Sequence, residues 1–162
     1  MQLKKMFTTV KEVILSTRPW SFTTGIIPVL VTAAVSQTPL LSTKVLSALA
    51  MALFVQAGAN LTNTYFDFIN EVDNKRYGEK TLVDKKLSPS FLLVLSILCY
   101  CIGVASVLPI LIERQDQQLI AIFSLGVVLA FFYTASPVGL KYRGEIVILR
   151  YNTQCCLYLR IT

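Results

Sequence analysis

Two long runs of uncharged, mostly apolar residues restrict this chain to a narrow class of folds. Residues 91–112, FLLVLSILCYCIGVASVLPILI, carry no charge over 22 positions, and residues 117–140 carry none over 24. As helices that rise about 1.5 Å per residue, both runs are long enough to cross a hydrocarbon layer of about 30 Å. Hydrophobic residues make up 54% of the chain, against roughly 45–50% in soluble domains. The sequence therefore predicts an all-α integral membrane protein.

Two earlier segments have the same character and bring the prediction to four spans, near residues 19–37, 45–67, 90–112 and 117–137. Lysine and arginine number four before the first span, then one, five and one in the successive connections, and three within residues 141–150. By the positive-inside rule, the amino terminus, the 68–89 loop and the segment after residue 140 are expected on the cytoplasmic side. The net charge of +6 then reflects topology, and nucleic acid is not an expected partner.

The beginning of the chain does not resemble a secretory signal peptide, because its first apolar run starts late and no cleavage site follows. No targeting segment distinguishes an endoplasmic reticulum, Golgi or mitochondrial membrane. The chain contains no histidine, which excludes imidazole metal ligands and His-based catalytic triads. Its four cysteines, at positions 99, 101, 155 and 156, have no spacing typical of a metal site or a structural disulfide. Carboxylates, amides and basic groups are therefore left to carry any chemistry.

One stripe of polar residues interrupts the second span. Gln56, Asn60, Asn63 and Asp67 are spaced 4, 3 and 4 apart, which places them within an arc of about 60° on a helix. Amides join membrane helices at about 0.6–2 kcal/mol per contact, and this is the expected role of Gln56 alone. A carboxylate within a span is costly and usually marks an ion or substrate path. The four residues, called the polar stripe below, thus predict a binding site.

The loop that follows the polar stripe carries both acidic and basic residues. Asp73 follows Asp67 by six positions, and a helix break after Phe68 would let Asp73 fold back toward Asn63 and Asp67. Oxygen ligands of this kind suit Mg²⁺, which binds through one or two carboxylates together with substrate phosphates. The basic residues of the loop, which would neutralise phosphate oxygens, are Lys75, Arg76, Lys80, Lys85 and Lys86. For any single lysine, ordinary cytoplasmic loop charge is the alternative; together with the polar stripe, these residues predict a diphosphate site at a membrane face.

Three stretches resemble a known family: RPWSF at 18–22, GANLTNTYFDFINEVDNKRYGEKTLVD at 58–84, and FFYTASPVGLKYRGEIVIL at 131–149. They are similar to the UbiA superfamily of membrane prenyltransferases, most of all to its animal branch, which makes menaquinone-4. The resemblance covers about residues 12–149. It implies a polytopic bundle of nine transmembrane helices, of which residues 1–149 would form the first four to five. In that family two aspartate-rich motifs hold Mg²⁺ and a prenyl diphosphate above a hydrophobic tunnel that is open to lipid.

By this resemblance Asn63, Asp67 and Asp73 match the first motif and would be the catalytic residues that bind Mg²⁺. The residues implied in substrate binding are Asn60, Lys75, Arg76, Asp84, Arg18, Tyr133 and Lys141, the last of which is followed by Tyr142. The implied reaction transfers a prenyl group, with geranylgeranyl diphosphate as the expected donor, to an aromatic quinol of the naphthoquinol type, in menaquinone or ubiquinone synthesis. Attack by an electron-rich ring on a cation-like allylic carbon needs no covalent enzyme intermediate, so the lack of histidine does not weaken this interpretation.

The sequence departs from the family in two places. A second aspartate-rich motif is missing, since the acids after Asp84 are Glu113, Asp116 and Glu145, and the first two are expected on the opposite side of the membrane. Residues 150–162, RYNTQCCLYLRIT, are too short and polar to span and are expected to be a divergent tail of a truncated product. The chain alone is then expected to be inactive. Two alternatives stay open: a non-catalytic membrane module that binds prenyl diphosphate or partner proteins, and a small transporter with Asp67 as its ion site.

Overall fold

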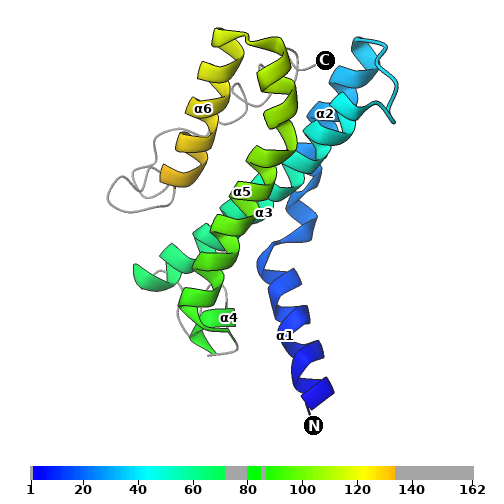
Figure 1. Ribbon diagram of the computed structural model, residues 1–162. Helices are drawn as coiled ribbons and strands as arrows, with labels where there is room; N and C mark the ends of the chain where they lie inside the picture. Colours follow the sequence, from blue (N-terminus) through cyan, green and yellow to red (C-terminus); the bar gives the residue numbers. More distant parts are fainter. Residues whose placement is uncertain (1, 72–79, 85–86, 134–162) are drawn as a thin grey trace.

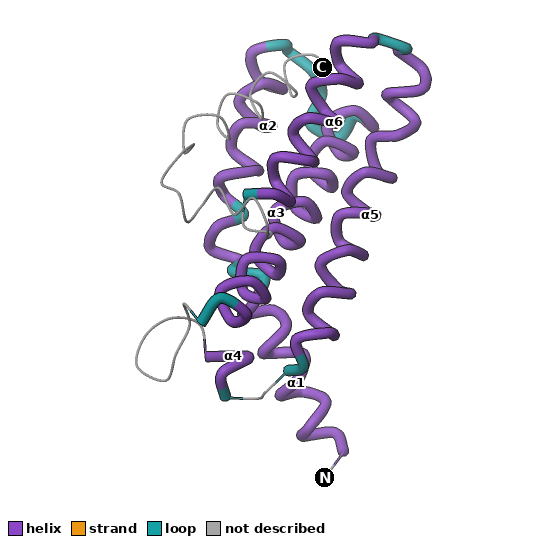
Figure 2. The backbone as a smooth tube through the Cα atoms, turned by 90° about the vertical axis from the view of Figure 1, so that its left-hand side faces the viewer, coloured by secondary structure: helices purple, strands orange, loops and turns teal. Residues whose placement is uncertain are grey.

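A computed structural model of the protein describes residues 2–71, 80–84 and 87–133. The helices, in chain order, are α1 (Gln2–Ser16), the 3-10 turn η1 (Pro19–Ser21), α2 (Thr23–Val35), α3 (Thr43–Ile69), α4 (Lys80–Val83), α5 (Pro89–Arg114) and α6 (Gln117–Phe132). The described ranges contain no strand, and α2, α3, α5 and α6 run along the long axis of one elongated bundle (Figures 1 and 2). The predicted all-α fold is confirmed.

The two longest helices, α3 and α5, have the length and the apolar composition needed to cross a membrane. Each begins at a serine whose side chain accepts a backbone hydrogen bond. Ser42 Oγ accepts from Val45 N at 3.4 Å, and Ser88 Oγ accepts from Phe91 N at 3.2 Å. Asp116 starts α6 in the same way, with Oδ1 accepting from two backbone N–H groups at 2.9 and 3.2 Å. Such side chains satisfy N–H groups that the first turn of a helix leaves without partners.

Close contact between α3 and α5 forms the centre of the bundle. A Cβ atom built on Gly103 would lie 2.9 Å from Val55 Cγ2, and one built on Gly58 would lie 3.1 Å from the Ser96 carbonyl oxygen. Neither position has room for a larger side chain without a shift of its neighbours. Small residues at such crossings let two helix backbones approach closely, which is a common way to pack membrane helices.

Two apolar clusters lie along this helix pair. The first joins α2, α3, α5 and α6 and consists of Val29, Ala33, Val45, Ala48, Met51, Ala52, Val107, Ile110, Leu111, Leu119 and Phe123. The second joins α3 and α5 to the α4 region and consists of Ala57, Leu61, Leu82, Leu87, Leu92 and Cys99, with Val13 and Phe22 packed against it. The second cluster therefore fixes the first span and the start of α5 around the half of α3 that carries the polar stripe.

The first span differs from the prediction. It is expected as one segment over residues 19–37, but α2 covers only Thr23–Val35, which is about 20 Å of helix and shorter than a hydrocarbon layer of about 30 Å. The chain instead passes through α1, then η1, then α2. Pro19 explains the break, because proline disfavours helical geometry at the residue before it and donates no hydrogen bond of its own.

Within α1, Lys11 is exposed and Val13 packs against the second cluster, but four other side chains have the opposite placement. Glu12 and Ser16 are buried against the protein, whereas Val10 and Ile14 are 50% and 52% exposed. A helix on a water-soluble protein normally shows the reverse arrangement. The carboxyl-terminal half of α1 is therefore suited to apolar surroundings, which extends the first span in the amino-terminal direction.

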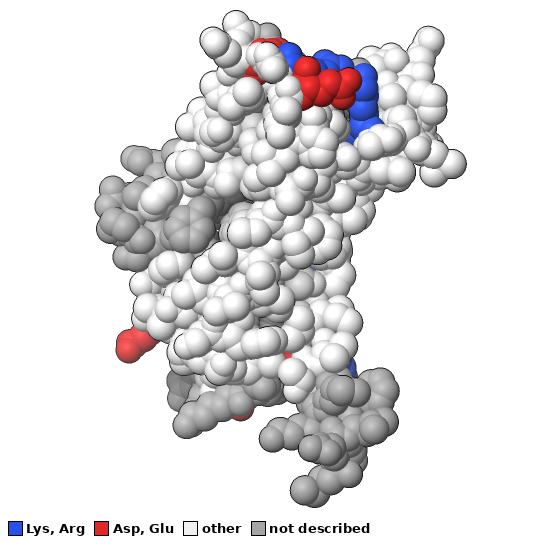
Figure 3. Space-filling model, viewed as in Figure 1, with Lys and Arg blue, Asp and Glu red and all other residues white. Residues whose placement is uncertain are grey.

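The two ends of the bundle differ in what they carry. The α2–α3 and α5–α6 connections lie at one end, whereas the carboxyl-terminal end of α3, the α4 helix and the amino terminus lie toward the other (Figure 1). In the view of Figure 3 the middle of the molecule shows almost no charged atoms, and a group of acidic and basic side chains covers the end formed by the connections. The α2–α3 and α5–α6 connections thus lie at the same end, as expected from the alternating numbers of basic residues in the sequence. Of the predicted fourth span, residues 134–137 lie outside the described ranges.

Candidate functional site

The polar stripe lies on the carboxyl-terminal half of α3, close to the end of the bundle that also carries α4. Gln56, Asn60 and Asp67 are buried, with exposed fractions of 7%, 9% and 4%, and Asn63 is partly buried. All four residues therefore face protein rather than the surrounding lipid. The stripe predicted from helical periodicity is present, and its two halves have different neighbours.

The half nearer the end of α3 consists of Asn63 and Asp67. Asn63 Nδ2 donates a hydrogen bond to Asp67 Oδ2 at 2.7 Å. The contact joins residues one helical turn apart, and a carboxylate acceptor makes such a bond stronger than one between neutral groups. It fixes the orientation of a carboxylate that is buried in a membrane protein.

The α3 helix ends immediately after this pair. Its last residue is Ile69, one position beyond the predicted break after Phe68. Glu71 then has a φ angle of 57°. This left-handed conformation cannot continue a right-handed helix, so the chain changes direction there. Asp73, the third residue of the predicted motif, lies outside the described residues.

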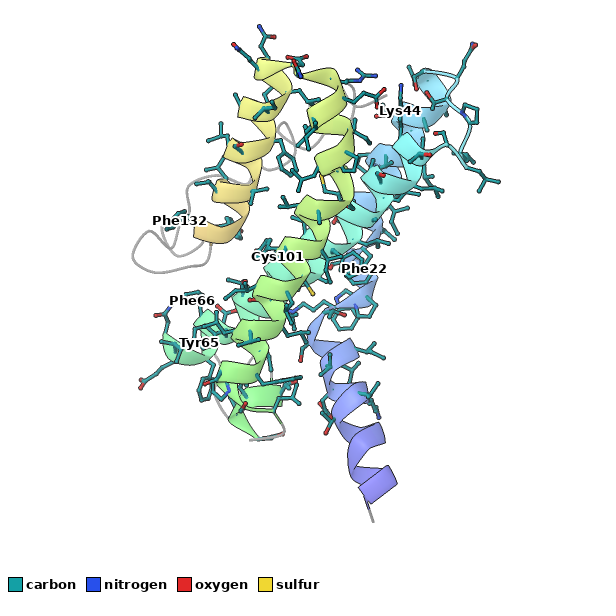
Figure 4. The ribbon with its side chains drawn as sticks, in the orientation of Figure 1. Phe22, Lys44, Tyr65, Phe66, Cys101 and Phe132 are labelled. Atoms are coloured by element: carbon teal, nitrogen blue, oxygen red, sulfur yellow. The ribbon has the colours of Figure 1, made fainter. Side chains whose placement is uncertain are left out.

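The half of the stripe nearer the middle of α3 contacts the break between α1 and α2. Asn60 Nδ2 donates to the Thr17 carbonyl oxygen at 2.7 Å and to Ser21 Oγ at 2.8 Å. Gln56 Nε2 also donates to Ser21 Oγ, at 3.2 Å. These contacts lie in the region where Phe22, labelled in Figure 4, packs beside α3. Sequence reasoning missed Ser21; the only available signal was a serine next to the Arg-Pro-Trp triplet.

Arg18 lies in this same break. Its backbone has φ 51° and ψ 66°, a left-handed conformation, and its side chain is partly buried. The Arg18 carbonyl oxygen accepts hydrogen bonds from both the backbone N–H and the hydroxyl of Ser21, each at 2.8 Å. The predicted substrate residue Arg18 is thus connected to Asn60 of the polar stripe through one serine.

The Thr-Leu-Val-Asp segment at 81–84 packs beneath α3. Thr81 and Leu82 are 1% and 3% exposed, and Leu87 N donates to the Thr81 carbonyl oxygen at 3.4 Å. Ser16 Oγ at the end of α1 contacts Thr81 Oγ1 at 3.4 Å. Asp84, expected in substrate binding, is exposed on the surface. This segment forms most of α4, and it therefore contacts the end of α1 through Thr81 and the second apolar cluster through Leu82.

The remaining predicted residues lie on another helix or outside the described residues. Tyr133 follows the last residue of α6, a helix separate from the polar stripe. Lys75, Arg76, Lys141 and Tyr142 lie outside the described residues. The α5–α6 connection, with Glu113 and Asp116, lies at the other end of the bundle from the end of α3 (Figure 1), as expected from the charge distribution.

Two residues of the site have oxygen atoms that a Mg²⁺ ion could take as ligands. Asn63 and Asp67 supply amide and carboxylate oxygens, which Mg²⁺ prefers as ligands. Three positions before Asp67, Thr64 Oγ1 is fully buried and has no hydrogen-bond partner. Within the described residues no group of three His, Cys, Asp or Glu side chains comes together. A complete metal cage would need ligands in addition to this pair.

A family model now identifies the chain. The model of the UbiA prenyltransferase family matches residues 25–149, which include the polar stripe and the Thr-Leu-Val-Asp segment. This chain belongs to the UbiA prenyltransferase family. Within that family the chain is an all-α membrane helix bundle, and the predicted resemblance is confirmed.

Relatives from animals support the same assignment. UbiA prenyltransferase domain-containing protein 1 of Danio rerio is 34% identical over 143 residues, and that of Homo sapiens is 33% identical over 143 residues. Each alignment covers 84% of this chain and 42% of the relative. The Drosophila melanogaster homolog is 31% identical over 153 residues, which is 88% of this chain and 42% of the homolog. The chain thus spans about two fifths of the length of these relatives, and no solved structure matches it.

Proposed function

We propose that this chain carries the Mg²⁺ and prenyl diphosphate site of an aromatic prenyltransferase. The proposed donor is geranylgeranyl diphosphate, and the proposed acceptor is a naphthoquinol-type ring in menaquinone or ubiquinone synthesis. The single observation that carries the proposal is the hydrogen-bonded Asn63–Asp67 pair, with Asp67 buried, at the end of a membrane-length helix. Its position is where the charged headgroup of a membrane lipid would lie while the tail extends along the apolar helices.

The pair is suited to a cation. A carboxylate that is 4% exposed in a membrane protein loses its hydration, so a bound cation would offset a large free-energy cost. Asn63 keeps one carboxylate oxygen of Asp67 oriented through its 2.7 Å hydrogen bond. Asp73 is proposed as the third ligand. When bound, Mg²⁺ would neutralise charge on the diphosphate as it leaves.

Basic and polar residues would complete the diphosphate site. The Arg18 guanidinium can form two parallel hydrogen bonds with phosphate oxygens or stack on an aromatic acceptor. Both hydrogens of Asn60 Nδ2 are used by Thr17 and Ser21, so Oδ1 is the Asn60 atom available to a substrate. The further residues proposed in substrate binding are Lys75, Arg76, Asp84, Tyr133 and Lys141.

In the proposed reaction the bond between the allylic carbon and the diphosphate oxygen breaks, and the electron pair leaves with the diphosphate. A ring carbon of the quinol forms the new carbon–carbon bond, and the ring then loses a proton. The residues of this chain would act by orienting the diphosphate and by excluding water, because positioned charges in a dry site stabilise the developing negative charge far better than water does. No nucleophilic side chain takes part.

The direct test uses the 162-residue chain reconstituted in lipid nanodiscs with labelled geranylgeranyl diphosphate, with and without Mg²⁺ and a dihydroxynaphthalene acceptor. Mg²⁺-dependent binding followed by a prenylated product supports the enzyme. Absence of Mg²⁺-dependent binding would show that the proposed diphosphate site is wrong.

The same test separates a second candidate, a non-catalytic membrane module that holds the prenyl diphosphate. The observation that favours it is the ligand set of the described residues, in which Asn63 and Asp67 form a pair and no group of three His, Cys, Asp or Glu side chains comes together. Mg²⁺-dependent binding without any product would identify this module.

A further inference from the structure

We infer that Ser21 is a positioning residue of this site: by joining Gln56 and Asn60 to the Arg18 carbonyl, it fixes the break in the first span and with it the place of Arg18. The inference rests on the proposed function only for the role of Arg18 toward the diphosphate. The geometry of the contacts stands by itself. Ser21, Gln56, Asn60 and the carbonyl groups of Thr17 and Arg18 are called the Ser21 network below.

The Ser21 hydroxyl uses its full hydrogen-bonding capacity. A serine hydroxyl has one hydrogen to donate and two lone pairs that accept. Here it donates to the Arg18 carbonyl at 2.8 Å and accepts from Asn60 Nδ2 at 2.8 Å and from Gln56 Nε2 at 3.2 Å. Ser21 thus uses all its hydrogen-bonding groups, and its two donors lie 35 and 39 positions further along the chain. This is unusual for a short exposed turn. It is expected where a turn must be fixed against another helix.

Asn60 solves a specific problem of the helix break. In a continuous helix the Thr17 carbonyl would accept from the backbone N–H of Ser21, but that N–H bonds the Arg18 carbonyl at 2.8 Å. A carbonyl left without a partner is costly in a membrane protein, and side chains of neighbouring helices usually supply the missing donor. Asn60 Nδ2 does so, at 2.7 Å from the Thr17 carbonyl oxygen.

Arg18 provides an independent observation. A left-handed backbone at φ 51° is unfavourable for any residue with a Cβ atom, and such strain persists only where surrounding contacts impose it. Arg18 follows the end of α1, where its N–H donates to the Leu15 carbonyl at 3.0 Å and where a left-handed residue is common. Two hydrogen bonds from Ser21 join the Arg18 carbonyl in this conformation. An arginine in this conformation, beside the helix that carries Asn63 and Asp67, is what a positioned substrate-binding side chain requires.

The test compares Ser21→Ala with the wild-type 162-residue chain in nanodiscs. Trp20, the sole tryptophan of the chain, adjoins Ser21 in η1, so its fluorescence anisotropy reports on the turn without any ligand. We expect lower Trp20 anisotropy, unchanged helix content by circular dichroism, and Mg²⁺-dependent binding of geranylgeranyl diphosphate weakened by about tenfold, the order expected when one charged hydrogen bond to the ligand is lost.

Two further variants make the comparison specific. Thr24→Val removes a hydroxyl from the same region, one that donates to the Ser21 carbonyl at 2.7 Å and does not reach α3, and should leave anisotropy and affinity at their wild-type values. Ser21→Thr retains the hydroxyl and should restore both readouts toward wild type. Equal effects of Ser21→Ala and Thr24→Val would overturn the inference, because any hydroxyl in the region would then suffice.

The two readouts separate failure of the inference from failure of the proposed function. Unchanged Trp20 anisotropy in Ser21→Ala would overturn the Ser21 network. Lower anisotropy with unchanged affinity would overturn its positioning role. If the wild-type chain binds no geranylgeranyl diphosphate, the proposed function fails and the positioning role falls with it, whereas the anisotropy still decides whether the network fixes the turn.

Discussion

At the scale of one residue, Arg18 combines an unfavourable backbone conformation with a side chain that has a proposed function. Its left-handed backbone, at φ 51°, would suit glycine, whereas its guanidinium is the proposed contact for a diphosphate. Gln115, at the end of α5, has nearly the same conformation, with φ 48°, and lies at the other end of the bundle (Figure 1). The two residues therefore allow backbone strain to be separated from side-chain function.

We predict that Arg18→Gly stabilises the folded chain by about 1 kcal/mol, because glycine adopts the left-handed region without the Cβ penalty. The same substitution should weaken Mg²⁺-dependent binding of geranylgeranyl diphosphate by at least about tenfold, as a charged hydrogen bond is worth about 1.5–3 kcal/mol. The measurements are chemical unfolding in detergent and ligand titration in nanodiscs.

The matched control is Gln115→Gly, which should stabilise the chain by a similar amount and leave ligand affinity unchanged. If Arg18→Gly binds the diphosphate as tightly as wild type, Arg18 has no part in the site.

At the scale of the element, the sequence predicts some features well and others poorly. The positions of α3 and α5 and the face that carries Gln56, Asn60, Asn63 and Asp67 follow from hydrophobic runs and helical periodicity, and both are present in the structure. Periodicity says which residues share a face, but it does not say what that face meets. The division of the stripe into a pair at the helix end and an amide pair on the first span depends on tertiary contacts.

The first span shows why such contacts escape a sequence-based prediction. The residues of α1 mix charges with apolar side chains, so they give no long apolar run, and Arg-Pro-Trp is equally typical of a plain membrane anchor. The role of Ser21 depends on donors that lie 35 and 39 positions away. No local pattern around Ser21 reports on those donors.

The packing of α3 against α5 supports a second prediction. Gly103→Ala should destabilise the chain by about 1–3 kcal/mol, the range for overfilling a packed core, because its Cβ would lie 2.9 Å from Val55 Cγ2. Adding Val55→Ala should recover part of the loss, since that methyl group is then gone. Thermal unfolding in detergent measures both effects.

Ala105→Val is the control for this prediction, since Ala105 lies on the same helix and is exposed, and it should change stability little. Equal destabilisation by Gly103→Ala and Ala105→Val would mean that the α3–α5 crossing is not tightly packed at Gly103.

At the scale of the whole molecule, the numbers of basic residues in the connections predict which connections share one side of the membrane, and the helix bundle places them at the same ends. Gln37 follows α2 and Glu71 follows α3, and both are exposed. In a variant whose four native cysteines are serines, we predict that a membrane-impermeant maleimide added to sealed vesicles whose outer face is the non-cytoplasmic one labels Gln37→Cys. Glu71→Cys should be labelled only after permeabilisation, because the 68–89 loop carries five basic residues and is expected on the cytoplasmic side.

Labelling of Glu71→Cys in intact membranes, with Gln37→Cys protected, would reverse the orientation. The proposed diphosphate site would then open to the compartment opposite the cytoplasm.

The central claim is that the Asn63–Asp67 pair binds a prenyl diphosphate through Mg²⁺, and one substitution tests it most directly. Asp67→Asn keeps the size of the side chain and removes the charge, so it should abolish Mg²⁺-dependent binding of geranylgeranyl diphosphate to the reconstituted chain without changing its helix content. Asp116→Asn makes the same change at the other end of the bundle, where asparagine caps a helix as well as aspartate, and should bind like wild type. Full Mg²⁺-dependent binding by Asp67→Asn would contradict the account.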